Sequence, residues 1–240
     1  APRSPGGPPR APRRLPPRPR GARPAAAPGL VQCGGLGVLT FAAARIGTDS
    51  AAVHGVSEAL VNVVFTAAVA VGQATVPLIA GYAGSGDVVR VRGSVWAGMR
   101  VALAAVGVLG TVLLVFRDPV LHLFTGTPAV ADQVLRLLPL VLAVVVTDAL
   151  QAVAGFGLVG LKRAGPSLVS TAVWFGILAA VSVPVADAAG LPGLWSALAA
   201  ANLLQAVTKT VSFHRHTARL ATLAAPPGER ARPDGQAPAR

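Results

Sequence analysis

The chain alternates long apolar runs with short polar segments, and this pattern limits the folds open to it. Six runs reach or approach the length of about 20 residues with which a helix crosses the hydrocarbon core of a bilayer. They lie at 30–46, 57–80, 96–116, 131–159, 166–185 and 190–213. Short segments rich in glycine, aspartate, serine or proline separate them. The sequence therefore predicts an all-α, polytopic membrane protein with six transmembrane helices.

The composition agrees with a chain that lies in a bilayer. Of the 240 residues 53% are hydrophobic and 12% are charged, whereas about 25% of the residues of a soluble domain are charged. The single cysteine, Cys33, excludes an internal disulfide framework and a multi-cysteine zinc site. The four histidines are scattered and no catalytic constellation stands out. We therefore expect neither an enzyme nor a metal site.

Both ends of the chain differ in composition from the middle. Residues 1–28 contain ten prolines and seven arginines, and such a segment buries too little apolar surface to offset the entropy of ordering. We predict a disordered cytoplasmic arm at 1–28, a six-helix lobe at 29–221 and a disordered cytoplasmic tail at 222–240. A nucleic-acid arm, a twin-arginine signal and a lipoprotein signal ending at Cys33 fit less well, because prolines interrupt the arginines and Gln32 is too large for cleavage.

Basic residues are distributed unequally between the two sides that these spans define. One side collects the arginine arm, Arg90, Arg92, Lys162, Arg163, Arg215 and Arg219. The other collects Arg45, Arg117 and Arg136. By the positive-inside rule, both termini lie in the cytoplasm of a multi-pass plasma-membrane protein. The net charge of +12 is then a topology signal that attracts anionic lipid of the bilayer, and we expect no nucleic-acid partner.

Asp148 is the most informative polar residue within the apolar runs. It lies near the middle of the fourth run, and helical spacing places Gln151 on the same face. Ionisable groups at membrane depth are expensive and mark ion or substrate pathways. Asp148 either binds a proton or a sodium ion during transport or is a structural aspartate bonded to neighbouring helices.

Two other runs carry polar residues at helical spacing. In the second run Asn62, Thr66 and Gln73 project the same way, either into a cavity or into hydrogen bonds between helices. Glu58 lies at the outer end of this run, where we expect a hydrated mouth.

The last run repeats this pattern. Asn202, Gln205 and Lys209 share one face. Lys209 is near the cytoplasmic end, and we expect its ammonium group to snorkel toward water.

Three motifs resemble a known transporter family. The second run reads His54-Gly-Val-Ser-Glu58, then Val71-Gly-Gln-Ala-Thr-Val76, and is followed by the loop Gly81-Tyr-Ala-Gly-Ser-Gly-Asp87. Asp148-Ala-Leu-Gln151 precedes Gly160-Leu-Lys162, and Gly190-Leu-Pro-Gly-Leu-Trp195 opens the last run. At this spacing the motifs resemble the multidrug and toxic compound extrusion (MATE) transporters of the NorM-like branch.

The resemblance implies an incomplete transporter. Full-length members have two six-helix lobes, and residues 30–220 resemble the C-terminal one, so a second lobe, from another chain or by self-association, is an expected partner. Asp148 matches the acidic group of the C-lobe cation site. Gln32 stands where many bacterial members have a glutamate, which leaves the site with one acidic ligand fewer. The expected coupling ion is H+ or Na+, without any other cofactor.

The resemblance also implies an activity. We expect the lobe of a cation-coupled antiporter that exports small organic or drug-like compounds by alternating access. Two alternatives remain open at this point. One is a flippase of the same superfamily that moves lipid-linked sugars, and the other is a non-transporting remnant or accessory half-subunit.

Overall fold

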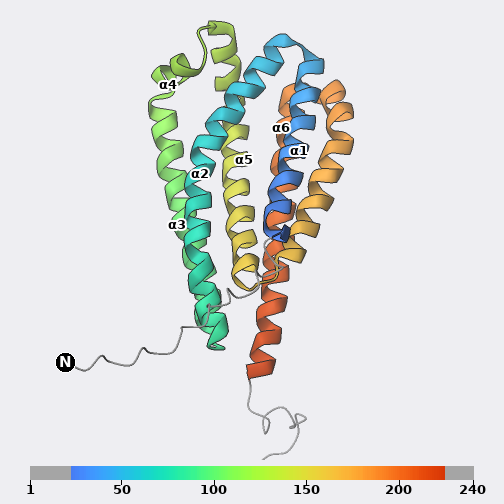
Figure 1. The fold of residues 1–240 in the computed structure, drawn as a ribbon. Helices are drawn as coiled ribbons and strands as arrows, with labels where there is room; N and C mark the ends of the chain where they lie inside the picture. Colours follow the sequence, from blue (N-terminus) through green and yellow to red (C-terminus); the bar gives the residue numbers. More distant parts are fainter. Residues whose placement is uncertain (1–22, 225–240) are drawn as a thin grey trace, which may run out of the picture.

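The computed structural model describes residues 23–224, with side chains from 31 to 222. Within that range the helices are α1 (Arg23–Ile46), α2 (Thr48–Gly84), α3 (Val88–Val115), α4 (Arg117–Phe124), α5 (Pro128–Gly160) and α6 (Ala164–Ala224). Every regular element between residues 23 and 224 is a helix (Figure 1). The prediction of an all-α protein is therefore confirmed.

The long helix α6 contains a reversal of the chain. Gly190 has φ 61° and ψ −156°, a backbone conformation that is essentially restricted to glycine because a Cβ atom would clash. Figure 1 shows the two legs of α6, residues 164–189 and 191–224, running in opposite directions. The sequence separated the predicted runs 166–185 and 190–213, and the structure places the change of direction between them at Gly190.

Apart from Phe116 and Gly190 at their ends, the six predicted apolar runs lie in helices, namely α1, α2, α3, α5 and the two legs of α6. Four helices, α2, α3, α5 and α6, are long and apolar enough to cross a membrane, and α1 contributes a shorter apolar segment, Val31–Ile46. The number of crossings stays a prediction. The segment Arg117-Asp118-Pro119, predicted as a break between runs, begins the short helix α4 (Arg117–Phe124) instead, because Pro119 is tolerated in the first turn of a helix.

The helical region exceeds the predicted lobe at both ends. α1 begins at Arg23, inside the segment predicted as a disordered arm, and α6 continues to Ala224, beyond the predicted boundary at residue 221. Pro24 is compatible with this start because the first helical turn needs no N–H donor there. The rest of the predicted arm and tail, residues 1–22 and 225–240, lies outside the described residues.

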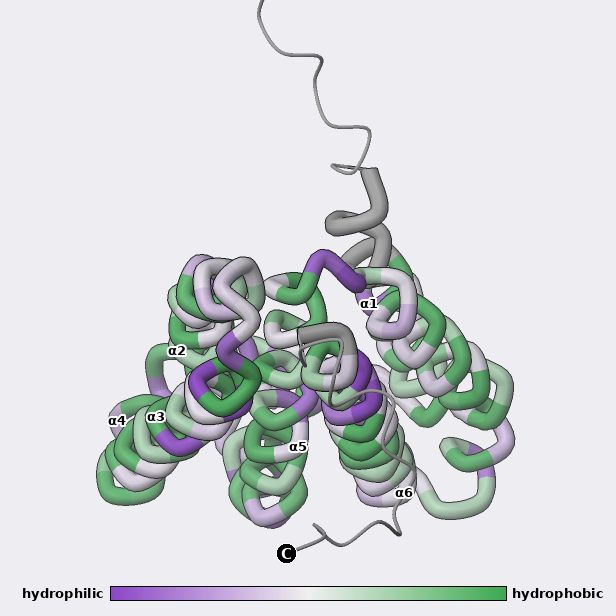
Figure 2. Tube along the Cα trace, turned by 90° about the horizontal axis from the view of Figure 1, so that it is seen from below, coloured by the Kyte–Doolittle hydropathy of each residue, from purple (hydrophilic) through white to green (hydrophobic). Residues whose placement is uncertain are grey.

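α5 occupies the middle of the bundle and is the most buried of the long apolar helices. It packs against α2, α3 and α6, whereas α1 packs against α6 and α2. Figure 2 looks along the helices and shows α5 between the α2–α3 pair and α6. Residues in the middle of α5 are therefore surrounded by other helices.

Small residues bring α5 close to α2. A Cβ atom added to Gly160 of α5 would lie 2.8 Å from the Cβ of Ile79, and one added to Gly72 of α2 would lie 2.4 Å from Cδ2 of Phe156. Glycines at such a contact let two membrane helices approach closely. We call this close contact the α2–α5 seam. It determines which polar residues of α5 lie opposite α2.

The family-like loop between α2 and α3 has a defined local structure. Gly86 has a φ of 75°, and the next residue, Asp87, accepts a 3.0 Å hydrogen bond from the backbone N–H of Arg90. This bond caps the N-terminus of α3, where the first N–H groups lack partners within the helix. The Gly-Asp pair therefore turns the chain and starts the next helix.

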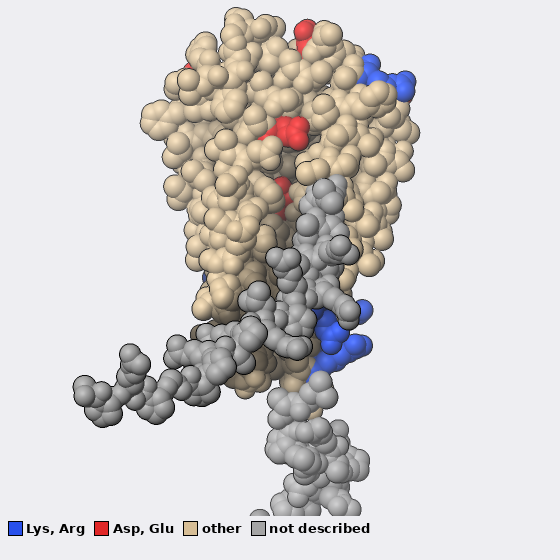
Figure 3. All heavy atoms as spheres, in the orientation of Figure 1, with Lys and Arg blue, Asp and Glu red and all other residues tan. Residues whose placement is uncertain are grey.

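The outer surface of the bundle is apolar. Large hydrophobic side chains such as Phe41, Val63, Trp96 and Val108 are exposed. On the face drawn in Figure 3, most of the described surface is uncharged, basic atoms gather near the lower and upper ends, and acidic atoms appear at the upper end and further down toward mid-height. A surface of this kind matches a lipid environment.

Candidate functional site

Asp148 lies in the buried middle of α5. Its side chain is 5% exposed, and its Oδ1 accepts a 2.8 Å hydrogen bond from Nε2 of Gln151, one turn further along the helix. Burying an ionised carboxylate is costly unless hydrogen bonds or an opposite charge compensate. The surroundings of Asp148 provide both.

The opposite charge comes from Lys209 on the second leg of α6. Its Nζ donates to Oε1 of Gln151 and, at 3.1 Å, to Oε1 of Gln205. We call Asp148, Gln151, Lys209 and Gln205 the buried polar chain, since none of these side chains is more than 5% exposed. Gln151 thus donates to a carboxylate and accepts from an ammonium group, so a single amide joins opposite charges.

The prediction that Lys209 snorkels was wrong. The side chain is 4% exposed and extends into the bundle next to Gly155 of α5, where an added Cβ atom would lie 3.8 Å from its Cδ. The absence of a side chain at Gly155 leaves room for the lysine stem. Two amide oxygens then supply the hydrogen bonds that water would have supplied.

A small pocket lies on the other side of Asp148, and we call it the central pocket. It is lined by Gln32, Leu36, His54, Glu58, Val61, Asn62, Val144, Asp148, Phe175, Trp195, Leu198 and Asn202. The centre of a water molecule has about 30 Å³ available there, which suits one or two waters or a small ion. It is far below the 300–1,000 Å³ typical of sites for drug-sized molecules.

Several polar groups face one another around the central pocket. Nε2 of His54 lies 3.7 Å from Oε2 of Glu58 and 3.4 Å from Oγ1 of Thr40, and the His54 ring contacts Trp195 edge to face at 5.7 Å. Nδ1 of His54, Nε1 of Trp195 and Oδ1 of Asn202 are buried and have no hydrogen-bond partner among the described side chains and backbone. Since buried polar atoms normally have partners, these atoms are available to a small polar ligand.

The described residues contain no metal-ligand set of three His, Cys, Asp or Glu side chains. The oxygen atoms at the central pocket are the carboxylates of Asp148 and Glu58 and the side-chain amides of Gln32, Asn62 and Asn202. Such neutral and anionic oxygens suit a hard monovalent cation or a protonated water better than a transition metal. The pocket is therefore a candidate site for a proton or a sodium ion.

The structure brings together only some of the predicted site residues. Asp148, Gln32 and Asn62 line the central pocket, and Gln151 belongs to the buried polar chain. Thr66 and Gln73 are exposed on α2 and do not line this pocket, and Oγ1 of Thr66 bonds back to the carbonyl oxygen of Asn62 at 2.7 Å. That these two residues line a cavity stays a prediction.

Sequence reasoning did not connect three residues with Asp148. His54 and Trp195 were part of the family-like motifs, and Asn202 was placed on the same helix face as Lys209, but nothing in the sequence joined them to α5. The i, i+4 spacing of His54 and Glu58 was a signal that the two side chains are neighbours. Glu58, expected at a hydrated mouth, is 29% exposed and lines the central pocket.

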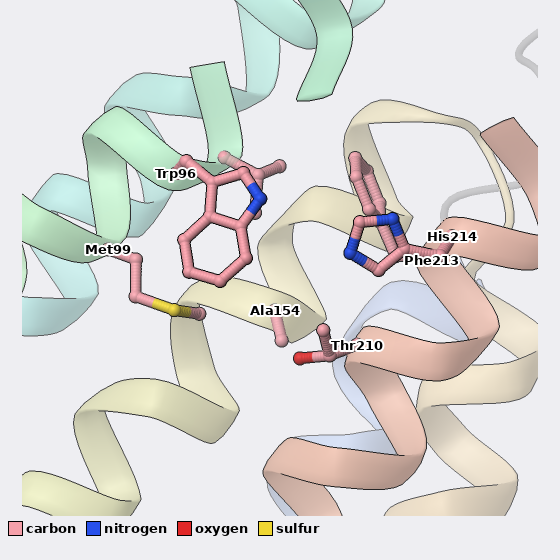
Figure 4. Close-up of a pocket in the computed structure, with 7 residues that line it drawn as sticks. Trp96, Met99, Ala154, Thr210, Phe213 and His214 are labelled. Carbon is pink, nitrogen blue, oxygen red and sulfur yellow. The ribbon is translucent and has the colours of Figure 1, made fainter. Parts of the chain in front are cut away.

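A second hollow lies on the opposite side of α5. Figure 4 shows Trp96 and Met99 of α3 facing Phe213 and His214 of α6 across Ala154. Its lining is almost entirely apolar, and only about 10 Å³ is available to the centre of a water molecule. This volume holds no more than one water, and the hollow offers no carboxylate to a cation.

These features define a class of protein: a helical membrane protein with an apolar exterior and a buried pair of opposite charges in its interior. The family model described as MatE matches residues 24–185, more than half of the chain. The chain therefore belongs to the MATE family of transporters, which confirms the resemblance identified from its motifs.

Curated relatives and solved structures agree with this assignment. The chain is 28% identical over 186 residues to a probable multidrug resistance protein NorM of Aromatoleum aromaticum, covering 74% of this chain and 40% of the relative. It is 26% identical over 197 residues to a protein of the same description from Xanthomonas campestris pv. campestris, covering 80% of this chain and 43% of the relative. The similarity to the NorM-like branch is thus confirmed.

Two crystal structures share the fold. A MATE protein in the straight conformation superposes with a TM-score of 0.75 at 14% identity, over 82% of this chain and 45% of the other. The eukaryotic MATE transporter AtDTX14 superposes with a TM-score of 0.69 at 19% identity, over 84% of this chain and 47% of the other. The chain spans less than half the length of each of these proteins.

Proposed function

We propose that this chain is one lobe of a cation-coupled antiporter that exports organic, drug-like compounds by alternating access. The single observation that carries the proposal is the position of Asp148. This buried carboxylate lies between a small polar pocket on one side and a fixed hydrogen-bond partner on the other. Membership of the MATE family supports a role in transport.

Coupling follows from the two environments of Asp148. A proton or ion that enters the central pocket neutralises the charge of Asp148, whose hydrogen-bond partner Gln151 in turn accepts a hydrogen bond from Lys209 on the second leg of α6. A bound cation drives transport only if it stabilises one access state more than the other. The contact between these two helices is where we expect that difference to arise.

The small central pocket argues that the organic substrate binds elsewhere. Transporters built from repeats bind substrate between the two repeats, and this chain matches less than half of its relatives. We propose that a second six-helix lobe, a separate chain or another copy of this one, completes the path. The exposed polar residues of α2, Thr66 and Gln73, are candidates to line it.

The proposed orientation places both termini in the cytoplasm. Nε of Arg92, near the start of α3, donates a 3.1 Å hydrogen bond to Oγ1 of Thr217, near the end of α6. The contact supports the assignment of Arg90, Arg92, Arg215 and Arg219 to one side, because these residues flank it in the sequence. A predominance of Lys and Arg on one side favours the cytoplasm.

Export of a fluorescent lipophilic cation from cells that produce the chain tests the proposal. We expect Asp148→Asn to abolish export, and Asp118→Asn, the same change at a 71%-exposed aspartate, to leave it intact. Unchanged export by Asp148→Asn would remove Asp148 from the mechanism.

One alternative function rests on the length of the chain. A non-transporting remnant or accessory half-subunit is consistent with a chain that covers 40% to 43% of its curated relatives. Self-association in mild detergent, or a bound second six-helix chain, would favour transport. A strictly monomeric protein without export would favour the accessory role.

The flippase alternative has less support. A cavity for a lipid-linked sugar would carry basic groups to bind the phosphates. The charged residues that line the central pocket are Asp148 and Glu58, which are acidic.

A further inference from the structure

We propose that a hollow near the start of α5 binds an anionic phospholipid, with the lipid phosphate on Arg136 and an acyl chain along the apolar wall. This end of the bundle is the outer one in the proposed orientation, so we call the site the outer hollow. It is lined by Val53 of α2, by Gln133, Arg136, Leu137 and Leu140 of α5, and by Leu191 and Pro192 of α6. The ligand is a component of the bilayer, so the inference does not depend on the proposed transport function.

The outer hollow is larger than the central pocket and its floor is apolar. The centre of a water molecule has about 190 Å³ available in it, against about 30 Å³ in the central pocket. The floor is buried, since Val53 is 1% exposed, Leu137 5% and Leu191 7%. In a bilayer a hydrocarbon chain that enters such a space gains van der Waals contacts with its walls. The floor of the outer hollow therefore suits an acyl chain.

Arg136 gives the outer hollow its charge. Of the described side chains that line it, Arg136 is the charged one, and it is exposed at the rim with Gln133, three residues before it on the same helix face. Within residues 31–222 no carboxylate lies within ion-pair distance of the Arg136 guanidinium. A guanidinium binds a phosphate through two parallel N–H groups. The outer hollow is therefore complementary to an anion that carries an apolar chain.

The depth of Arg136 in the bilayer matches that of a lipid headgroup. The apolar run 131–159 has its midpoint at Val145, nine residues beyond Arg136. At about 1.5 Å per residue these residues lie about 14 Å apart along α5, close to the half-thickness of about 15 Å of the hydrocarbon core. From this depth a long arginine side chain reaches the phosphate layer. Leu137 and Leu140 follow Arg136 toward the middle of the helix, where the acyl chain would lie.

Other occupants fit the outer hollow less well. A cationic organic compound would meet a positive charge at the rim, and a free phosphate would leave the apolar floor uncovered. A second copy of this chain would take the guanidinium out of water, which is costly without a partner of opposite charge. A zwitterionic lipid carries an ammonium group that offsets the attraction of its phosphate. An anionic phospholipid matches both the charge at the rim and the apolar floor.

Quenching of a fluorophore beside the outer hollow tests the inference. In a Cys33→Ser background the fluorophore is attached at Ser196→Cys, an exposed position one turn beyond Pro192 on the second leg of α6. The chain in detergent micelles is titrated with phosphatidylglycerol or phosphatidylcholine that carries a spin label on its acyl chain. We expect saturable quenching, with an affinity for phosphatidylglycerol at least about threefold higher than for phosphatidylcholine, because only the former has a net negative charge.

Replacement of the arginine tests the charge at the rim. Arg136→Gln should weaken the binding of phosphatidylglycerol at least about threefold and leave that of phosphatidylcholine less changed. Arg117→Gln, the same change at a 57%-exposed arginine at the start of α4, is the matched control and should leave both affinities unchanged. Arg136→Lys, which retains the charge, should keep the preference for phosphatidylglycerol.

A larger side chain tests the apolar wall. Leu140 is half-buried at the outer hollow, so Leu140→Trp should fill part of it and weaken the binding of both lipids. Leu123→Trp, the same change at an 85%-exposed position of α4, should have no effect. If Leu140→Trp does not fold, Leu140→Phe replaces it.

Four results would overturn the inference. The first is equal affinity for the two lipids in the wild type, and the second is unchanged phosphatidylglycerol binding in Arg136→Gln. The third is displacement by sn-glycerol 3-phosphate as effective as that by unlabelled phosphatidylglycerol, which would identify a site for free phosphate. The fourth is loss of self-association in Arg136→Gln with unchanged quenching, which would identify an interface with a second copy. Lipid binding is measured without transport, so its outcome is separate from the effect of Asp148→Asn on export.

Discussion

Gln151 donates a 2.8 Å hydrogen bond to Asp148 from one turn further along α5. The same side chain accepts a hydrogen bond from Lys209 of α6, so two helices that are adjacent in the fold share one buried amide. Gln151 therefore connects the candidate coupling carboxylate, Asp148, to the second leg of α6.

Replacing Gln151 by leucine should destabilise the chain. The substitution keeps a similar volume but leaves Asp148 and Lys209 without their shared partner, and unsatisfied buried groups cost about 1–3 kcal/mol. Thermal unfolding in detergent measures the loss. Gln73→Leu, the same change at an exposed position of α2, should shift stability by less than about 0.5 kcal/mol. Equal effects of the two variants would show that the bridge contributes nothing.

The α2–α5 seam should not tolerate an added methyl group. In Gly160→Ala the new Cβ atom would lie 2.8 Å from Ile79 and 3.2 Å from the carbonyl oxygen of Val76, so the helices must separate. Overpacking of this kind costs about 1–3 kcal/mol. Gly176→Ala is the matched control, because a Cβ atom there meets nothing within 4 Å. A Gly160→Ala variant as stable as this control would contradict the close approach of the two helices.

The reversal of α6 should depend on Gly190. An alanine at φ 61° and ψ −156° is strained by about 1–3 kcal/mol, and the unfolding temperature should fall accordingly. Gly165→Ala, in the same helix but without a positive φ or a close neighbour, serves as the comparison. If Gly190→Ala unfolds at the same temperature as Gly165→Ala, the helix does not turn at this residue.

The proposed orientation predicts which loops a membrane-impermeant thiol reagent reaches in intact cells. In a background with Cys33→Ser, a cysteine at position 49, at the N-terminal end of α2, should be labelled from outside. A cysteine at position 85, in the loop between α2 and α3, should be labelled only after the membrane is permeabilised. The opposite pattern would reverse the orientation derived from the distribution of Lys and Arg.

Much of the fold was predictable because it depends on local patterns. The apolar runs at 57–80 and 131–159 fall within α2 and α5, and the run at 96–116 ends one residue beyond α3, since a helix is the structure that satisfies every backbone group of such a run in lipid. The helix start at Arg23 was missed because proline and arginine content was interpreted as disorder, although proline is compatible with a first turn.

The candidate site was predictable in part. Asp148 and Gln151 were found together because their spacing is local. Gln32 was predicted from the family resemblance and Asn62 from polar residues at helical spacing, and both line the central pocket with Asp148. The bond from Lys209 to Gln151 joins residues 58 positions apart in the sequence, and no periodicity indicates such a contact. Only the packing of α6 on α5, with its gap at Gly155, reveals that Lys209 turns inward.

Transport in vesicles made from cells that produce the chain tests the central claim most directly. With a proton gradient imposed across the membrane, wild-type vesicles should accumulate a fluorescent lipophilic cation, and Asp148→Asn vesicles should accumulate no more than vesicles without the chain. Gradient-driven accumulation that is equal in the wild type and in Asp148→Asn, or absent from both, would contradict the account.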